Sequence, residues 1–419
     1  MTFAPQTPVT AADIDAAAHR LTGRITRTPV TYSERLSRNT GAQVWLKRED
    51  QQEVRSYKSR GATNLIDQLT DEQKAAGVVC ASAGNHAQGV AFACAQLGVQ
   101  ARIYLPRTTP RQKRNRVAAL GGSYVDVVVG GDTYDAASTA ASDFAETTGS
   151  TLVPAFDHPW TIAGQGTVVR EAIQDLPQVP DVVVVPVGGG GLLAGAATYL
   201  SQRHPEVRIV GVEPAGAASM RAALDAGGPV MLPKVDPFVD GAAVRRVGDH
   251  TFPVAQAAGV EVLSVSEGRV SVEMIALYQT EGIVAEPAGA LAPAAIEALD
   301  LQPGQVVVAI LSGGNNDVLR YPEVMERALV YEGRKHYFLV DFPQEPGALR
   351  TFLSEVLGPD DDIALFEYVK RSNRETGPAL VGIELGRRED LAPLLERMDA
   401  SRMQVEQIPP DSPLFRFIL

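Results

Sequence analysis

The sequence predicts an α/β protein with two parallel sheets, followed by a smaller α+β domain. Residues 62–160 alternate strand-like and helix-like segments at the spacing of βαβ units, which build parallel sheets. Two valine-rich runs, 182–185 and 305–311, have the continuous apolar character of strands that are buried on both faces. Past Tyr321 the pattern changes, and residues 336–419 follow the order βαββαβ of a ferredoxin-like domain.

The composition is that of a globular protein with large cores. The chain has 419 residues, 45% of them hydrophobic, which is enough for two or three domains. Its net charge of −12 argues against nucleic acid or an anionic membrane as the main partner. Cys80 and Cys94 lie in apolar surroundings and cannot form a disulfide framework. Because the sequence has no signal-like start and no apolar run of transmembrane length, we expect a cytoplasmic protein.

The first half of the chain alternates strands and helices. Thr10 and Asp13 form a capping-box pattern, which predicts a helix that ends near Leu21. Apolar runs predict strands at 44–47, 77–81, 101–105, 124–129 and 151–156. The helical period predicts helices at 85–97, 109–120, 134–147 and 167–176, the last of them after Gly164 and Gly166. A small α/β subdomain over about 62–160 is therefore expected to be inserted into a larger one.

The second half supplies the rest of the large sheet. Strands are expected at 182–185, 208–212, 262–265 and 305–311, and helices at 192–200, 217–226, 268–281 and 288–299. The prolines at 229, 233 and 237 make 228–250 irregular. We therefore expect one domain over 1–320 and a linker at 321–335.

The C-terminal residues 336–419 predict a separate module. Strand 336–342, helix 347–356, strands 363–371 and 379–384 as a hairpin, helix 390–400 and strand 402–407 follow one another. This length is sufficient for a domain that folds alone.

The stretch 181–195, DVVVVPVGGGGLLAG, predicts an anion-binding site. Four glycines, Gly188, Gly189, Gly190 and Gly191, lie between a buried strand and a helix that begins near Leu192. Such a loop lets backbone N–H groups converge on an oxyanion, and the helix dipole favours negative charge there. The alternative is a plain turn, although one glycine would suffice for that. The pattern matches neither a P-loop nor a GxGxxG fingerprint, so a phosphate-bearing ligand other than a particular nucleotide is indicated.

Three further candidates are ambiguous when each is taken alone. Lys58, in RSYKSRGA, could be a desolvated amine nucleophile or a solvated lysine. The loop of Ser82, Ala83, Gly84, Asn85 and His86 leads from a strand to a helix start, so it could bind a carboxylate or simply cap the helix. Ser312 ends a buried strand, where α/β sheets place ligands, but Ser312-Gly-Gly could be only a turn. His86 fits a structural histidine better than a catalyst.

Together these elements are the parts that a pyridoxal phosphate site needs: a phosphate loop, a lysine, and polar groups for the pyridine ring. The ordered motifs KREDQQEVRSYKSRGA, SAGNHAQGVA, FDHPWTIAGQGT, PVGGGGLLAG, EPAGA and LSGGN resemble those of the fold-type II pyridoxal-phosphate enzymes, a tryptophan-synthase-β-like fold. More narrowly, they resemble the threonine dehydratases, also called threonine ammonia-lyases. The resemblance covers essentially the whole chain.

The resemblance implies a role for each candidate. Lys58 would be the catalytic residue and would carry pyridoxal 5'-phosphate as a Schiff base. Asn85 would meet the pyridine 3-oxygen, and Ser312 the pyridine nitrogen. Gly188, Gly189, Gly190, Gly191 and Leu192 would hold the phosphate. Ser82, Ala83, Gly84, Asn85 and His86 would take the substrate carboxylate.

The same residues favour elimination over racemisation. A neutral serine at the ring nitrogen does not enforce protonation of the ring, which suits loss of a leaving group from the neighbouring carbon. Related serine racemases place a second acid–base serine where this chain has Ala83, which cannot carry a proton. The expected reaction is therefore dehydration and deamination of L-threonine to 2-oxobutanoate and ammonia, the first committed step of isoleucine biosynthesis, with Lys58 as the base.

The C-terminal module indicates regulation. PQEPGAL, at 343–349, resembles the loop and helix start of ACT-type amino-acid-binding domains. In threonine dehydratases such a module implies feedback control, here by isoleucine with valine opposing. It could equally serve as an oligomer contact, and we expect a homo-oligomer, a tetramer or a dimer.

No metal site is expected. Related serine racemases use a Glu and a downstream Asp, but here Glu213-Pro214 is followed by Ala-Gly-Ala-Ala-Ser219, without that acidic partner. A monovalent cation held by carbonyls stays open. Glu286, in EPAGA, would either tune the cofactor site or cap the helix that begins at Pro287. Two other functions stay open: an L-serine/threonine dehydratase of catabolic role, and a non-catalytic amino-acid sensor.

Overall fold

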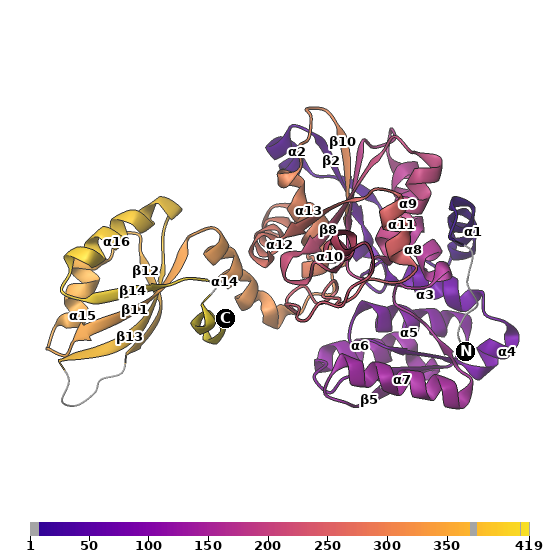
Figure 1. The fold of residues 1–419 in the computed structure, drawn as a ribbon, viewed down its shortest axis with the longest axis horizontal. Helices are drawn as coiled ribbons and strands as arrows, with labels where there is room; N and C mark the ends of the chain where they lie inside the picture. The colour runs from indigo at the N-terminus through magenta and orange to yellow at the C-terminus, as the bar shows by residue number, and fades with distance from the viewer. Residues whose placement is uncertain (1–7, 369–374, 411, 419) are drawn as a thin grey trace. The chain divides into compact units, whose positions relative to one another are not determined.

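The computed structural model describes residues 8–368, 375–410 and 412–418. Their contacts divide the chain into two units, Met1–Asp317 and Val318–Leu419. The first unit contains a six-stranded sheet and a four-stranded sheet, and the second unit contains one four-stranded sheet (Figure 1). The α/β class and the smaller C-terminal module are confirmed.

The large sheet has the strand order β1-β2-β10-β7-β8-β9. Its strands are β1 (Val30–Tyr32), β2 (Gln43–Arg48), β10 (Val306–Leu311), β7 (Val182–Pro186), β8 (Arg208–Pro214) and β9 (Glu261–Val265). All neighbouring pairs are parallel except β1 and β2. Every residue of β7 and β10 is buried, as their valine-rich runs predict. Helices α9 (Gly191–Arg203) and α13 (Pro287–Ala295) pack against these strands.

The small sheet is formed by residues that lie between β2 and β7 in the chain. Its parallel strands are β5 (Val125–Val129), β4 (Ala101–Leu105), β3 (Val78–Ala81) and β6 (Thr151–Leu152). Helices α5 (Asn85–Leu97), α6 (Arg111–Gly121) and α7 (Tyr134–Thr148) surround it (Figure 1). Strand β6 is shorter than the predicted 151–156, because Pro154 cannot donate to a sheet and the chain turns away there.

Helices α3 (Lys58–Asp67) and α8 (Pro159–Asp175) lie in the chain between strands of the two sheets, and α1 (Ala11–Leu21) packs against α3, α8 and α9. The sequence predicts α8 only from residue 167, because glycines inside a helix are unfavourable. The structure shows why they are present. A Cβ added at Gly164 would lie 2.6 Å from Arg60 O, and one at Gly166 would lie 3.0 Å from Gly195 O. The glycines therefore let α8 pack closely on α3 and α9.

The remaining helices of the first unit are α2 (Glu34–Thr40), α4 (Asp71–Ala76), α10 (Ser219–Ala226), α11 (Thr251–Ala257) and α12 (Glu267–Glu281). The sequence did not predict α2, α4, α11 or the short strand β1. Each of these elements has seven residues or fewer, too few for a periodic signal to stand out.

The second unit is an antiparallel sheet of order β12-β13-β11-β14 with helices on it. It consists of β11 (Lys335–Pro343), α15 (Ala348–Thr351), a π-helical turn (Phe352–Val356), β12 (Asp362–Tyr368), β13 (Thr376–Glu384), α16 (Leu391–Ala400) and β14 (Gln404–Ile408). The order of its elements is the predicted βαββαβ. Residues 369–371, the end of the predicted strand 363–371, lie outside the described residues. Phe338, Phe352 and Val381 are among its core residues.

Helix α14 (Tyr321–Tyr331) occupies most of the segment that was expected to be a linker. Its buried residues Val324 and Ala328 lie one turn apart, so the helix has a packed side, and it belongs to the second unit.

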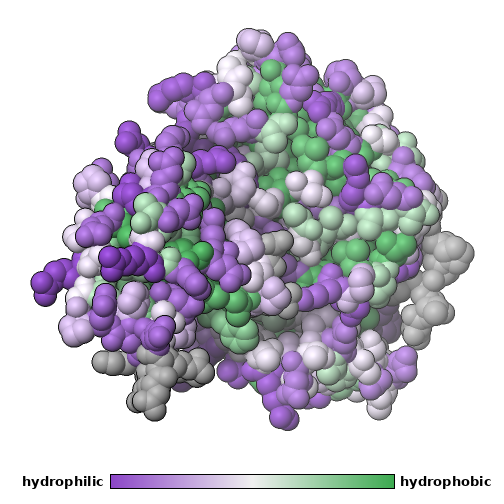
Figure 2. All heavy atoms as spheres, turned by 60° about the vertical axis from the view of Figure 1, so that its left-hand side comes forward, coloured by the Kyte–Doolittle hydropathy of each residue, from purple (hydrophilic) through white to green (hydrophobic). Residues whose placement is uncertain are grey.

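Hydrophilic residues cover much of the face in Figure 2, with hydrophobic residues in patches between them. Within the described ranges, no helix combines the length and the apolar character needed to cross a bilayer.

Candidate active site

Lys58 and Ser312 are held side by side by the backbone. Ser56 and Gly313 form an antiparallel bridge, and the Tyr57 N–H donates to Ser312 O at 3.2 Å. Lys58 is the first residue of α3, and Ser312 follows the last residue of β10. The structure thus brings the lysine to the carboxyl edge of the large sheet, where α/β proteins bind ligands.

The Lys58 amine points at the segment that follows β6. Its Nζ donates to Ala155 O at 3.1 Å, and the same carbonyl accepts a hydrogen bond from Gln165 Nε2 at 3.1 Å. Lys58 is half-buried, whereas Gln165 is buried. The lysine is therefore partly packed between elements, and its amine has a hydrogen-bond partner in the protein.

The glycine loop lies directly beside this segment. A Cβ added at Gly189 would be 2.4 Å from the Phe156 ring, and one at Gly191 would be 2.4 Å from Gln165 Oε1. Gly190 has φ of +92°, a conformation that favours glycine. Three of the four glycines are thus required here by close packing or by backbone conformation.

Backbone amides are available for an anion at this loop. Gly191 is the first residue of α9, so the first-turn N–H groups, Leu192 included, have no acceptor within the helix. The Gly189 carbonyl is already used, since it accepts from Thr251 Oγ1 at 2.7 Å. The loop therefore offers donors rather than acceptors.

The loop from Ser82 to His86 connects β3 to α5 and reaches the large sheet. Ser82 Oγ accepts from Gly84 N at 3.2 Å. Asn85 Nδ2 donates to Glu286 Oε1 at 2.6 Å, and Asn85 Oδ1 accepts from Asn315 Nδ2 at 2.7 Å. Ala83 and Gly84 are partly exposed at the start of α5. Asn85 is thus brought to the same strand end as Ser312.

Ser312 is buried, with 4% of its surface exposed. Its hydroxyl donates to Ala288 O at 3.1 Å, and a hydroxyl can rotate to donate to another acceptor such as a pyridine nitrogen. The group is neutral, as expected of the partner of a pyridine nitrogen in this reaction class.

His86 has the structural role that the sequence favours. Its Nε2 donates to Val153 O at 2.8 Å, and the side chain is 5% exposed. Burial, with a smaller contribution from the Lys58 charge, lowers the pKa of His86 to about 4. The imidazole is therefore neutral near pH 7 and is not placed to act as a general acid.

The low pKa of His86 predicts a pH-dependent stability. The pKa of His86 in the folded protein, about 4, lies below its ordinary value of about 6.5. The contribution of the neutral imidazole to stability is therefore fully present above about pH 6.5 and is lost as the pH falls from there toward 4. Between about pH 7 and pH 5 the wild type should lose up to about 2 kcal/mol more than His86→Gln. Urea midpoints followed by tryptophan fluorescence measure this, and equal losses in both proteins would contradict it.

The residues fit pyridoxal phosphate. A loop with amide donors and no room for side chains suits the phosphate, and Lys58, Asn85 and Ser312 lie together as an amine, an amide and a hydroxyl for the rest of the cofactor. A pocket of about 190 Å³, lined in part by His86, Ala155 and Phe156, adjoins this place.

Four residues at the site were not assigned by sequence reasoning. Phe156 and Gln165 pack on the glycine loop, Thr251 holds the Gly189 carbonyl, and Asn315 holds Asn85. Phe156, Gln165 and Asn315 lie within the motifs FDHPWTIAGQGT and LSGGN, so their signal was present. Thr251 lies outside any recognised motif.

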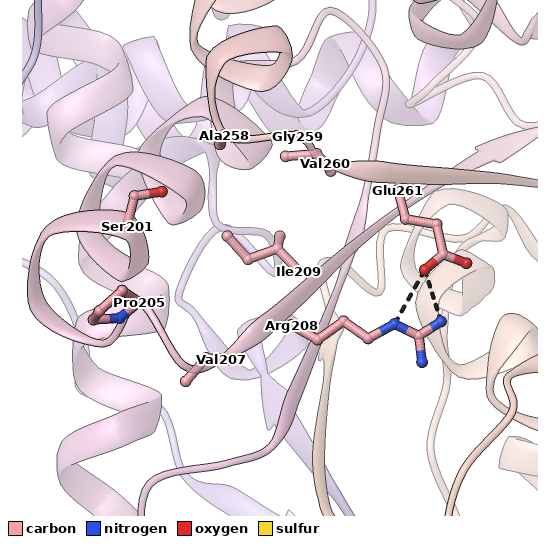
Figure 3. Close-up of a pocket in the computed structure, with 9 residues that line it drawn as sticks. All are labelled: Ser201, Pro205, Val207, Arg208, Ile209, Ala258, Gly259, Val260 and Glu261. Carbon is pink, nitrogen blue, oxygen red and sulfur yellow. Dashed lines mark hydrogen bonds and ion pairs between the residues drawn. The ribbon is translucent and has the colours of Figure 1, made fainter.

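In the described part of the chain, no three His, Cys, Asp or Glu side chains are grouped to hold a metal ion, and Glu213 accepts from Met220 N and Arg221 N. Figure 3 shows a surface pocket where Arg208 donates to Glu261. Arg208 and Glu261 are the first residues of β8 and β9, so this pocket lies at the amino ends of the strands, whereas the glycine loop follows the carboxyl end of β7. None of the predicted site residues lines the pocket.

Two family models match the chain. Residues 21–313 match the family described as pyridoxal-phosphate dependent enzyme. Residues 326–418 match the C-terminal regulatory domain of threonine dehydratase. The cofactor of the first unit is accordingly pyridoxal phosphate, and the second unit is a regulatory domain.

Individual relatives agree over nearly the full length. The biosynthetic L-threonine dehydratase of Mycobacterium leprae is 59% identical over 418 residues, which is 99% of this chain and 98% of that protein. The Bacillus subtilis protein of the same name is 46% identical, with 94% of both chains covered. A processed threonine deaminase isoform of Solanum lycopersicum superposes with a TM-score of 0.71 at 38% identity, over 77% of this chain and 96% of that one. The chain therefore belongs to the pyridoxal-phosphate-dependent enzymes and, among them, to the biosynthetic L-threonine dehydratases.

Proposed function

We propose that this chain converts L-threonine to 2-oxobutanoate and ammonia, as the committed step of isoleucine biosynthesis. The observation that carries the proposal is that the start of α3 with Lys58, the Ser312 strand end and the Asn85 amide come together at the carboxyl end of β10, while the Lys58 amine and the glycine loop both contact the segment after β6. Membership in the biosynthetic threonine dehydratases supports the choice of substrate.

Lys58 has two tasks in this proposal. Its Nζ would hold the cofactor covalently, and as a free amine it would accept the Cα proton of L-threonine. The hydrogen bond from Nζ to Ala155 O gives the released amine a defined position. Bound pyridoxal phosphate supplies the electron sink that makes this proton acidic.

The other residues bind and orient. Amides of Gly188–Leu192 would hold the phosphate, Ser312 would meet the pyridine nitrogen, and Asn85 would meet the ring oxygen. The loop from Ser82 to His86 binds the substrate carboxylate at the N-terminus of α5. Because Ala83 carries no proton, all base chemistry comes from Lys58, which favours loss of the β-hydroxyl over racemisation.

The first experiment is a spectrum and an assay of the full-length protein. We expect a visible cofactor band and formation of 2-oxobutanoate from L-threonine. The ratio of kcat/KM values for threonine and serine then tests the substrate, since one methyl group contributes only about 1–3 kcal/mol to discrimination. A larger value for serine would overturn the threonine assignment, and no turnover together with isoleucine binding would favour a sensor.

We further propose that isoleucine inhibits the enzyme by binding the second unit, with valine opposing it. The match to a threonine dehydratase regulatory domain supports this. Inhibition should persist at saturating threonine, and Lys58→Ala should still bind isoleucine in calorimetry because the two sites are distinct. Competition with threonine alone would contradict a separate regulatory site.

We also propose that the chain forms a homo-oligomer, a tetramer or a dimer. Phe417 and Leu353 are 90% and 46% exposed, and contacts between subunits would cover this apolar surface.

A further inference from the structure

Glu286 is a buried carboxylate whose side chain does not cap its helix. The residue precedes Pro287 at the start of α13, where a capping role was one of two readings of the sequence. Its side chain makes no capping hydrogen bond, and it is 5% exposed. Instead, Oε1 accepts from Asn85 Nδ2 at 2.6 Å. Since burying a carboxylate is costly, this contact with a candidate cofactor-binding residue calls for a function.

The hydrogen bonds determine which way the Asn85 amide points. Asn315 Nδ2 donates both to Val54 O, at 2.8 Å, and to Asn85 Oδ1, at 2.7 Å, so both of its protons are used. Asn85 must therefore turn its oxygen to Asn315 and its nitrogen to Glu286. Of the two protons on Asn85 Nδ2, one goes to Glu286 and one remains.

Glu286 is also close to the end of β10. Its N–H donates to Gly313 O at 3.2 Å, and a Cβ at Gly313 would lie 2.0 Å from Glu286 Oε1. Burial and the Asp240 carboxylate raise the pKa of Glu286 to about 7, while the bond from Asn85 and the charges of Lys113 and Arg55 oppose the rise. The carboxylate thus lies between Asn85 and the Ser312–Gly313 turn, within the site itself.

We propose that Glu286 is a positioning residue of the cofactor site: its hydrogen bond with Asn85 directs the remaining Nδ2 proton of that amide at the ring oxygen of pyridoxal phosphate. The inference rests on the function proposed above, in which Asn85 meets that oxygen. Glu286 acts through Asn85 and need not touch the reacting atoms.

The test measures the cofactor rather than turnover. Full-length wild type, Glu286→Leu and Glu286→Gln are resolved from cofactor and titrated with pyridoxal 5'-phosphate, and the visible spectrum of each loaded protein is recorded. Glu286→Leu should raise Kd about tenfold or more, because it leaves the Asn85 donor without its buried acceptor, and should move the visible maximum. Glu286→Gln keeps an acceptor oxygen and should stay within about threefold of wild type.

Glu273→Gln is the matched control, because Glu273 is a buried carboxylate of the same unit that pairs with Arg35 and Arg269. It should lower stability but leave Kd and the visible maximum unchanged. The proposal is overturned if Glu286→Leu binds cofactor like the wild type, or if Glu286→Gln is as impaired as the leucine variant. Should Glu286→Leu not fold, Asn315→Ala tests the same chain of bonds, and an unchanged Kd there overturns it. A wild type without a visible band would overturn the proposed function itself.

Discussion

Replacing Lys58 with alanine is expected to abolish the visible absorbance of bound cofactor and the turnover of L-threonine together. The variant lacks the amine that contacts Ala155 O, so in the proposed function it has neither the covalent attachment nor the base for the Cα proton. These two contributions together are expected to lower kcat by at least about 10³-fold. The measurements are the visible spectrum of the purified protein and the rate of 2-oxobutanoate formation.

A second lysine variant separates this effect from general damage. Lys74→Ala removes an amine whose Nζ donates to Asp67 O on the small subdomain, and it should keep both the band and the turnover. Thermal melting shows whether Lys58→Ala is folded. A folded Lys58→Ala protein that retains the visible band would contradict the assignment of Lys58, and with it the function proposed for the site.

Replacing Arg60 with methionine is expected to destabilise the first unit by about 3–5 kcal/mol, because it leaves buried carboxylates without their partner. Arg60 is fully buried on α3, two residues after Lys58. Its guanidinium donates to both carboxylate oxygens of Glu49 and to both of Glu171, at 2.7–2.8 Å. Burial alone would lower the pKa of Arg60, but the two carboxylates raise it above its ordinary value.

The cluster of Lys47, Glu49, Arg60 and Glu171 is electrically balanced: Lys47 Nζ completes it by donating to Glu171 at 3.0 Å. Removing Arg60 leaves two carboxylates facing one lysine. The cluster also joins α3 to β2 and α8. Its loss should therefore make the first turn of α3, which carries Lys58, less well ordered, and should raise the Kd for the cofactor.

The two tryptophans, Trp45 and Trp160, both lie in the first unit, so their fluorescence in urea follows that unit alone. Arg208→Met is the control, since the Arg208–Glu261 pair is 39% and 42% exposed (Figure 3) and should contribute less than about 1 kcal/mol. A midpoint for Arg60→Met equal to that of the control would show that the buried cluster does not stabilise the fold.

The sequence by itself determined the class of the fold and most of its elements. Valine runs at β7 and β10 report burial on both faces, and the βαββαβ order reports the second module, because both signals come from neighbouring residues. The glycine run and Lys58 were recognisable for the same reason: their chemistry is unusual in a short stretch. Ordered motifs then selected the family, which the relatives confirm.

Only the tertiary structure decided which side chains meet. The bridge between Ser56 and Gly313, the bond from Asn85 to Glu286 and the packing of Gln165 on Gly191 join residues that are far apart in the chain. The local periodicity of a sequence shows that one face of a helix or strand is buried, but it does not show which other element packs against that face. It also misjudged α8, since glycines that disfavour an isolated helix are required where α3 and α9 pack closely on it. Propensity is a local quantity, and here contacts between distant segments outweigh it.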